Sequence, residues 1–184
     1  MKIVEPVRSV KEIDKVKRLL GNKRDILLFT MGINSALRIS DLLSLKITDV
    51  IEGDKIKESI TIKEGKTKKT KSFPLNESVR KALKEYLGER KGAGPEEVLF
   101  LSRKGNEAIK RCQAWKLIND AGKSLGLNLG SHSLRKTFGF HVYKGTKNLG
   151  LTQKLLNHTN SSDTLRYIGL TKIEMDEVYK GLNL

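Results

Sequence analysis

Residues 131–169 read SHSLRKTFGFHVYKGTKNLGLTQKLLNHTNSSDTLRYIG, and the rest of the chain is best understood from this stretch. His132 and Arg135 lie three residues apart near its start. His158 follows, and Tyr167 comes nine residues after that histidine. An arginine grips phosphate oxygens with two parallel hydrogen bonds, and imidazoles transfer protons near neutral pH. The stretch is therefore suited to phosphate chemistry, with a phenol that needs activation before it can attack.

The start of this stretch is predicted to be a helix. Leu134, Phe138 and Val142 recur at helical spacing, so they form an apolar stripe beside the polar pair. Ser131 or Ser133 is suited to cap the first turn. The pattern predicts a helix that buries one face and carries the imidazole and the guanidinium together on another.

Most of the remaining chain also has helical periodicity. Helices are predicted over about 9–21, 23–36, 76–87, 107–125 and 171–182. From Lys55 to Pro74 the pattern alternates, and the lysine-rich turn EGKTKKT separates two half-buried strands. This predicts a β-hairpin, and the apolar segment VLFLS (98–102) predicts a third strand beside it. The expected fold is mainly α with a small antiparallel β-sheet, in the α+β class.

Cys112, the single cysteine of the chain, is predicted to lie in the core. It shares a helical spacing with Ile109, Trp115 and Ile118, which favours packing over a catalytic thiol. One cysteine cannot form an internal disulfide, which agrees with a reducing cytoplasm. No apolar run reaches the ~18 residues of a membrane span, so neither a membrane segment nor a signal peptide is expected. The histidines and the cysteine show no metal-ligand spacing.

The balance of charge points to a polyanionic partner. The chain has 184 residues, the size of one domain, and carries 36 Lys and Arg against 21 Asp and Glu, for a net charge of +15. A basic surface kept for solubility, or a ribosome-associated protein, is the alternative. Aromatic residues make up 5% of the chain, which argues against a base-stacking platform for single strands. Double-stranded DNA held through its phosphates fits better.

The order HxxR, LLNH and RY resembles the tyrosine recombinase family, the phage-integrase type of site-specific DNA recombinase. The family's H-x-x-R box falls on His132 and Arg135. LLNHTNSSDTLRY resembles its closing box L-G-H-x-x-x-x-T-x-x-Y, which assigns the second histidine to His158, the threonine to Thr164 and the nucleophile to Tyr167.

A second match lies upstream. NSALRISDLL resembles the family's T-G-x-R-x-S-E-L motif, which assigns the first arginine to Arg38 and its acidic neighbour to Asp41. Ala36 stands where the motif has glycine, and aspartate replaces glutamate. Asn157 also replaces a glycine, at a helix end where asparagine tolerates the left-handed conformation. None of these departures removes a reacting group.

The hairpin supplies the remaining reactive residue. KTKKTKSFP resembles the pattern K-T-G-x-x-x-x-x-P, in which a lysine acts on the leaving oxygen, and the match assigns this role to Lys66. Lys68 and Lys69 remain alternatives in the same turn. The other hairpin lysines are expected to contact the DNA backbone, and the predicted DNA-binding set is Lys63, Lys68, Lys69 and Lys71.

The resemblance implies a catalytic domain that cuts and rejoins duplex DNA through a 3′-phosphotyrosyl intermediate, without a metal, ATP or other cofactor. It implies self-association on DNA as a tetrameric synapse, an accessory DNA-bending or directionality protein as a partner, and a place in the nucleoid of the cytoplasm. Residues 1–184 are expected to be a single catalytic domain without the family's usual N-terminal core-binding domain. The final helix, about 171–182, is expected to dock on a neighbouring subunit or on its own core.

Two other functions stay open at this point. A type IB-like topoisomerase carries the same motifs and relaxes supercoiled DNA without exchanging partners. A basic DNA-binding protein with an inactive site is the non-enzymatic alternative, and it is weakened because no reacting residue is missing.

Overall fold

The computed structural model describes residues 4–169, 176 and 179–182, so most of the predicted helix 171–182 lies outside the described residues. The helices are α1 (Val10–Leu20), α2 (Lys23–Ser35), α3 (Ile39–Leu43), α4 (Ile47–Val50), α5 (Glu77–Leu87), α6 (Arg111–Lys123), α7 (Ser131–Thr146), α8 (Leu149–Leu156) and α9 (Ser161–Ile168). The strands are β1 (Ile51–Glu52), β2 (Lys55–Ile56), β3 (Ser59–Lys63) and β4 (Thr70–Pro74). This confirms the predicted fold class. Among the described residues, no helix is long and apolar enough to cross a membrane.

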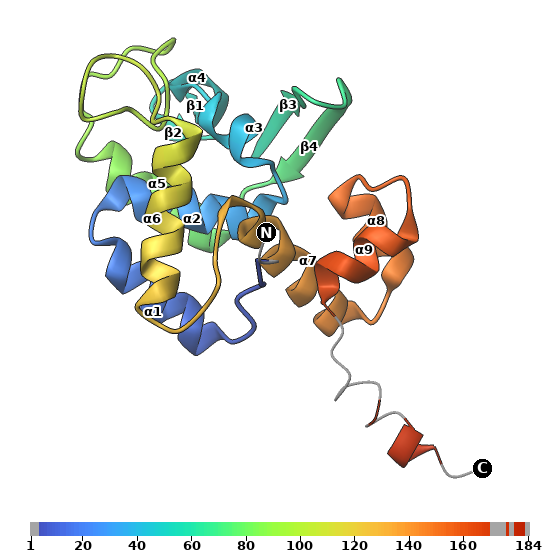
Figure 1. The fold of residues 1–184 in the computed structure, drawn as a ribbon. Helices are drawn as coiled ribbons and strands as arrows, with labels where there is room; N and C mark the ends of the chain where they lie inside the picture. The colour runs from blue at the N-terminus through green and yellow to red at the C-terminus, as the bar shows by residue number, and fades with distance from the viewer. Residues whose placement is uncertain (1–3, 170–175, 177–178, 183–184) are drawn as a thin grey trace.

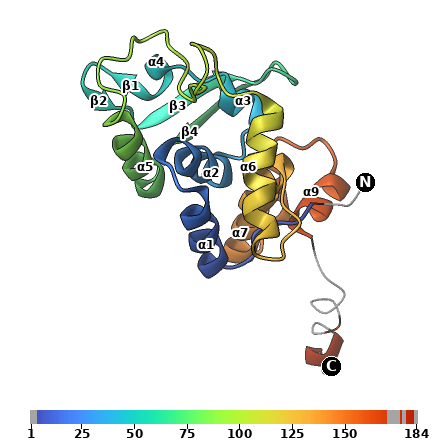
Figure 2. The same cartoon turned by 60° about the vertical axis from the view of Figure 1, so that its left-hand side comes forward.

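α2 is the central helix, and it contacts α1, α3, α5 and α7. Figure 2 shows it in the middle of the helical body. Leu27, Leu28, Phe29 and Met31 are each at most 1% exposed, as expected of a helix that is apolar on most of its sides. α8 and α9 pack on each other and on α7, and Figure 1 shows them as an arm beside the main body.

The predicted β-hairpin is confirmed, but the predicted third strand is wrong. β3 pairs with β4 in an antiparallel register that places Ile60 opposite Phe73. Residues 98–102 form only isolated bridges, and the second small sheet is β1 with β2. The segment is buried at Leu99 and Phe100, and its backbone bonds to Leu45 and to Glu107 and Ile109 in the loop before α6, not to the hairpin. A short apolar run in a buried loop has the same pattern as a strand.

The prediction that Cys112 lies in the core is also wrong. Cys112 is exposed, and Trp115 is 47% exposed. α6 begins later than predicted, so the buried Ile109 precedes the helix and does not set the phase of its apolar face. The buried apolar residues of α6 are Ala114, Ile118 and Ala121.

α7 confirms the helix predicted at the start of the stretch 131–169. Ser133 Oγ accepts a hydrogen bond from the backbone N–H of Gly130, the residue before the helix, at 3.0 Å. Leu134 is fully buried. Phe138 and Val142 are only half-buried, because they line a groove between β4 and α8. A Cβ on Gly32 would lie 2.5 Å from Leu134 Cδ1, so glycine is what allows α7 to approach α2 this closely.

Gly122 provides a test of the packing of α6. A Cβ at this position would lie 2.8 Å from the Leu127 carbonyl oxygen and 2.8 Å from Leu129 Cβ. We expect Gly122→Ala to lower the free energy of unfolding by about 1–3 kcal/mol, measured by urea denaturation, because backbone must shift to admit the methyl group. Gly145→Ala in α7 is the control, since a Cβ there meets nothing within 4 Å. A higher free energy of unfolding in Gly122→Ala would contradict the close approach of α6 to Leu127 and Leu129.

Candidate active site

α7 carries Arg135 into the interior, where the residue is 2% exposed. Its guanidinium donates to the carbonyl oxygens of Ala36 and Leu156, the second at 2.7 Å, and lies 3.4 Å from Nε2 of His158. Burying a cation is costly unless its N–H groups find acceptors. The two carbonyls supply such acceptors, so Arg135 joins the end of α2 to the end of α8.

His132 and Tyr167 meet where α7 faces α9. His132 Nδ1 lies 3.1 Å from the phenolic oxygen, which is hydrogen-bonding distance. Partial burial and the neighbouring cations Arg135 and Lys136 lower the pKa of His132 below its ordinary value. The imidazole is therefore neutral at pH 7, and in the tautomer with a free Nδ1 it can accept the phenol proton.

His158 lies directly after α8, where Asn157 adopts the left-handed conformation predicted for it, with φ 55°. The ring of His158 stands edge-on to that of Tyr167, with centroids 4.6 Å apart. Its Nδ1 lies 3.1 Å from Thr164 Oγ1. Burial, reinforced by the charge of Arg135, lowers the pKa of His158 to about 4. The neutral ring can accept from Arg135 at Nε2 while it donates to Thr164 at Nδ1.

The Tyr167 ring is half-buried on α9 and faces two cations. Arg135 Cζ and Lys136 Nζ each lie 5.9 Å from its centroid. Cations at this distance are attracted to the face of an aromatic ring. Together with the edge of His158, they hold the ring with its hydroxyl directed toward His132.

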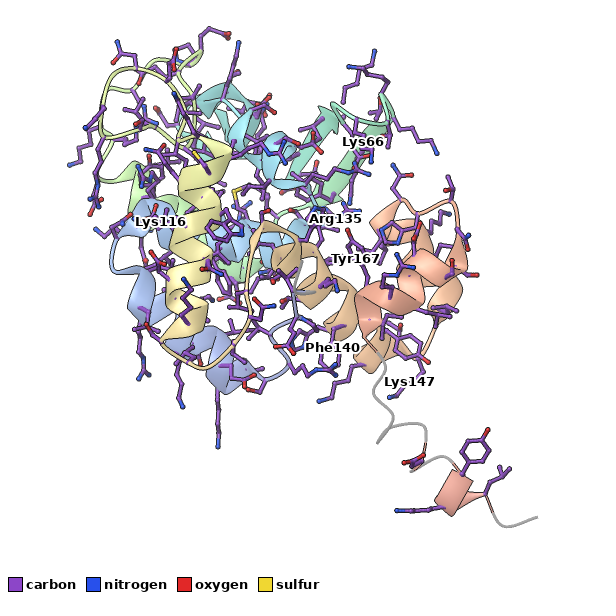
Figure 3. All side chains as sticks on the ribbon, in the orientation of Figure 1. Lys66, Lys116, Arg135, Phe140, Lys147 and Tyr167 are labelled. Carbon is purple, nitrogen blue, oxygen red and sulfur yellow. The ribbon has the colours of Figure 1, made fainter. Side chains whose placement is uncertain are left out.

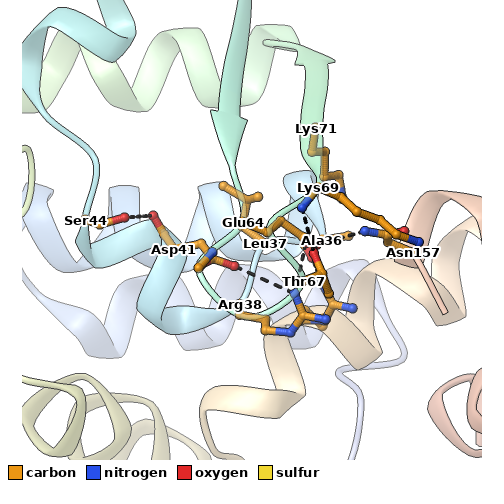
Figure 4. A network of polar contacts seen from close by, with 12 residues as sticks. Ala36, Leu37, Arg38, Asp41, Ser44, Glu64, Thr67, Lys69, Lys71 and Asn157 are labelled. Atoms are coloured by element: carbon orange, nitrogen blue, oxygen red, sulfur yellow. Dashed lines mark hydrogen bonds and ion pairs between the residues drawn. The ribbon is translucent and has the colours of Figure 1, made fainter. Parts of the chain in front are cut away.

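Arg38 begins α3 between two carboxylates (Figure 4). Its Nη1 lies 3.0 Å from Glu64 Oε1 and 3.9 Å from Asp41 Oδ2. Asp41 Oδ1 also accepts the backbone N–H of Gly65 at 3.0 Å. Asp41 therefore lies between the arginine and the hairpin turn, and its supporting role stays a prediction.

A cavity of about 280 Å³ lies beside Arg38, His132 and Arg135. Its lining consists of Arg38, Ile39, Ser40, Lys66, Arg111, Ser131, His132 and Arg135. Lys66 reaches it from the hairpin turn, and Figure 3 shows Lys66, Arg135 and Tyr167 on three separate elements around one side of the molecule. Lys68 is exposed, and Lys69 lines the groove beside β4 instead. Of the three lysines considered for the leaving oxygen, Lys66 is the one placed at the cavity.

The four lysines expected to contact DNA fall into two groups. Lys63, Lys68 and Lys69 are exposed along the hairpin. Lys71 is half-buried, and its Nζ donates to the carbonyl oxygen of Leu155 at 3.0 Å. Burial, together with nearby arginines, lowers the pKa of Lys71 to about 8. Lys71 thus braces the hairpin against α8 in this structure, unlike the other three.

Sequence patterns do not predict three residues of the site. Glu64 is fully buried, Lys136 faces the phenol ring, and Arg111 lines the cavity. A signal for Glu64 exists, because the inward alternation of Ile60 and Ile62 continues to position 64. Arg111 and Lys136 carry no such signal in a chain this rich in cations.

Comparison with known proteins agrees with the motifs. A model of the phage integrase family matches residues 10–174. The chain is 42% identical over 183 residues to the probable integrase/recombinase YoeC of Bacillus subtilis, covering 98% of this chain and 97% of that protein. It is 30% identical over 175 residues to the tyrosine recombinase XerA of Pyrococcus horikoshii, covering 94% of this chain and 60% of XerA.

Solved structures share the fold. The crystal structure of XerA recombinase has a TM-score of 0.77 at 24% identity, and covers 98% of this chain and 65% of that one. The XerH site-specific recombinase bound to its difH substrate has a TM-score of 0.68 at 23% identity, with 98% and 56% coverage. The chain thus spans nearly all of YoeC but less than two thirds of the Xer proteins. On the family match and the similarity to YoeC, the chain belongs to the phage integrase family of tyrosine recombinases.

Proposed function

We propose that this chain cuts and rejoins duplex DNA by transesterification, with Tyr167 as the nucleophile. The observation that carries the proposal is the 3.1 Å approach of the Tyr167 hydroxyl to His132 Nδ1, beside a cavity lined by two arginines and Lys66. A phenol needs a base within hydrogen-bonding reach to attack, and the neutral imidazole supplies one.

The proposed first step exchanges one phosphate ester for another. The Tyr167 oxygen bonds to phosphorus, and its proton passes to His132. The bond from phosphorus to the 5′ oxygen breaks, and Lys66 protonates that oxygen as it leaves. The products are a 3′-phosphotyrosyl link and a free 5′-hydroxyl, and a 5′-hydroxyl of another strand reverses the step. Because the link keeps the ester bond, the reaction consumes no nucleotide.

The charge that develops on the five-coordinate phosphorus must be met by fixed donors. Arg38 and Arg135 enter the proposal in this role because both line the cavity and a guanidinium can hold two phosphate oxygens at once. His158 enters the proposal in its other tautomer, in which Nδ1 accepts from the Thr164 hydroxyl and the Nε2 hydrogen is donated to a phosphate oxygen. Arg135 is buried and Arg38 and His158 are partly buried, which strengthens these interactions, since less water competes.

Duplex DNA is the proposed partner. The net charge of +15 and the exposed hairpin lysines favour contact with phosphates. Solved relatives were captured on DNA, among them XerH on difH and a lambda integrase (75–356) dimer on a COC′ core site. We further infer that residues 1–184 act as one catalytic domain, that copies assemble as a tetrameric synapse in the nucleoid, and that a DNA-bending or directionality protein assists.

A covalent-trap experiment tests the proposal. The protein is incubated with nicked duplex fragments of its source genome and denatured in SDS, and DNA that remains attached to peptide is sequenced. We expect an adduct that maps to Tyr167 by peptide mass and a recurring DNA sequence at the link. DNA binding in a gel shift without any adduct would favour a DNA-binding protein without strand cleavage. In a parallel reaction on supercoiled plasmid, relaxed circles without recombinant junctions would favour a topoisomerase.

The pH dependence of cleavage follows from the lowered pKa of His132. A protonated imidazole cannot take the phenol proton, so the rate falls at acidic pH, and the midpoint lies below the ordinary value of 6.5. We expect a rate that is level near neutrality, measured at subsaturating protein from about pH 5 to about pH 8. The variant His132→Gln should cleave slowly, and its cleavage rate should no longer fall at acidic pH. A midpoint above 6.5 would contradict the role of a base in these surroundings.

A further inference from the structure

Glu64 is a fully buried carboxylate in a strongly basic site, and the chemistry proposed above does not use it. It directly follows β3, on the inward side of the hairpin. Thr67 Oγ1 donates to its Oε2 at 2.5 Å, and Asn157 Nδ2 donates to the same oxygen at 2.8 Å. Its Oε1 lies 3.0 Å from Arg38 Nη1. One carboxylate therefore joins three separate segments, through two hydrogen bonds at Oε2 and an ion pair at Oε1 (Figure 4).

The charged form of Glu64 is maintained by these donors. Burial by itself would raise the pKa of Glu64, but the hydrogen bonds from Thr67 and Asn157 and the charge of Arg38 hold it below its ordinary value. A glutamine could not replace it fully, because with its amide oxygen placed to accept from Thr67 and Asn157, its NH2 group would face the Arg38 guanidinium, which is itself a donor. The site thus requires a carboxylate, not merely a polar group of this size.

The three segments that meet at Glu64 carry different reactive groups. Thr67 belongs to the turn that holds Lys66, and Arg38 begins α3. Asn157 ends α8 immediately before His158, on the arm that also carries Tyr167 on α9. That arm packs mainly on α7, so the hairpin reaches it through side chains. The contact of Lys71 with Leu155 is a second such bridge.

The residue at position 157 gives the link a specific chemical basis. Its backbone is left-handed, with φ 55° and ψ 41°, a conformation in which glycine is at ease and asparagine is tolerated. A glycine would satisfy the turn but would have no amide to reach Glu64. The asparagine therefore supplies a contact between the arm and the hairpin that the turn itself does not require.

We propose that Glu64 is a positioning residue that holds the Lys66 turn and the Arg38 guanidinium in register with the arm bearing His158 and Tyr167. The inference rests on the proposed function, since register matters only if Lys66 and Tyr167 act on the same phosphate. Glu64 forms and breaks no bond. It keeps the proton donor for the 5′ oxygen and the attacking phenol on opposite sides of one phosphorus atom.

The test compares two leaving groups. The duplex recovered in the covalent trap is synthesised with either oxygen or sulfur bridging phosphorus to the 5′ carbon. A thiolate leaves without a proton, because a thiol is far more acidic than an alcohol. We expect Glu64→Gln to slow cleavage of the oxygen substrate by about 10²-fold through misplacement of the turn. Asn157→Gly should slow it about tenfold. The sulfur substrate should restore part of both losses, because it needs no proton from Lys66 but still needs Arg38 and the arm in place.

Matched variants separate positioning from general damage. Glu58→Gln removes an exposed carboxylate just before the same strand, and Lys147→Gly changes another left-handed residue, φ 54°, at the end of α7. Both should cleave like wild type. Thr67→Ala should lose rate on the oxygen substrate, and Thr67→Ser should keep it because the hydroxyl remains. Wild-type rates for Glu64→Gln and Asn157→Gly would overturn the proposal, and so would equal losses on the two substrates.

Hydrogen exchange without DNA provides a readout that does not depend on cleavage. The amides of Gly65, Lys68 and Lys69 are bonded within the turn or to Asp41. We expect them to exchange faster in Glu64→Gln and Asn157→Gly than in wild type, and at wild-type rates in the two controls. Unchanged exchange in both test variants would overturn the proposal. A wild-type protein that forms no adduct would contradict the proposed function, while the exchange rates would still decide whether Glu64 links the arm to the hairpin.

Discussion

Tyr167→Phe is expected to abolish the covalent protein–DNA adduct and to leave the affinity for duplex DNA within about twofold of wild type, because phosphate contacts dominate that affinity. The variant removes the attacking oxygen and keeps the ring that packs on His158 and faces Arg135 and Lys136. Helix α9, which carries Tyr167, and its contacts with α7 should therefore persist. The adduct is measured on SDS gels with labelled duplex, and binding is measured by gel shift at one stated salt concentration.

Tyr143→Phe is the matched control for this variant, because Tyr143 is another half-buried tyrosine of the α7–α9 region. It should form the adduct at the wild-type rate. A covalent product with Tyr167→Phe would assign the nucleophile to another residue. A variant that lost both the adduct and DNA binding would show that the hydroxyl supports the fold or the interface, and that its loss does not isolate the chemical step.

Arg135→Lys is expected to reduce the cleavage rate by ~10²–10³-fold, the usual cost of losing one transition-state donor. Lysine keeps the positive charge but cannot hold two acceptors in a planar fork. The carbonyls of Ala36 and Leu156 are both bonded to this guanidinium, so one of them loses its partner. We therefore also expect the free energy of unfolding to fall by about 1–3 kcal/mol, the penalty for an unsatisfied buried polar group.

Arg166→Lys on α9 serves as the control, since Arg166 is exposed. Single-turnover cleavage and urea denaturation are measured on both variants under conditions in which both are folded. A variant at position 135 that is destabilised but cleaves at the wild-type rate would show that Arg135 only joins α2 to α8. A variant that is slow but fully stable would show that lysine can satisfy both carbonyls and that the loss lies in the chemistry.

Local patterns predict several elements of this fold correctly. The helices predicted over about 9–21 and 23–36 and the hairpin are all confirmed. The errors at Cys112 and at residues 98–102 have one cause. Apolar spacing indicates which residues are buried, but it does not show whether they belong to a helix, a strand or a loop. Ile109, Leu99 and Phe100 are all buried, and all three lie in loops.

For the candidate site, the sequence identifies candidate residues but not their surroundings. Arg38, Lys66, His132, Arg135, His158 and Tyr167 are assigned from the resemblance to the family's motifs, and their roles in the reaction stay predictions that the experiments above decide. Their environment does not come from spacing. The burial of Arg135 and the contact of Lys71 with Leu155 depend on how the arm packs against the helical body.

The sequence by itself determined the fold class, the order of the motifs and the strong positive charge, because each depends on residue type and on short spacings. The tertiary structure alone decided that Glu64 meets Asn157, 93 positions away, and that Arg135 reaches Ala36, 99 positions away. The physical reason is the cost of burying charge. A carboxylate or guanidinium enters the interior only where distant segments bring it donors or acceptors, and no local pattern specifies those partners.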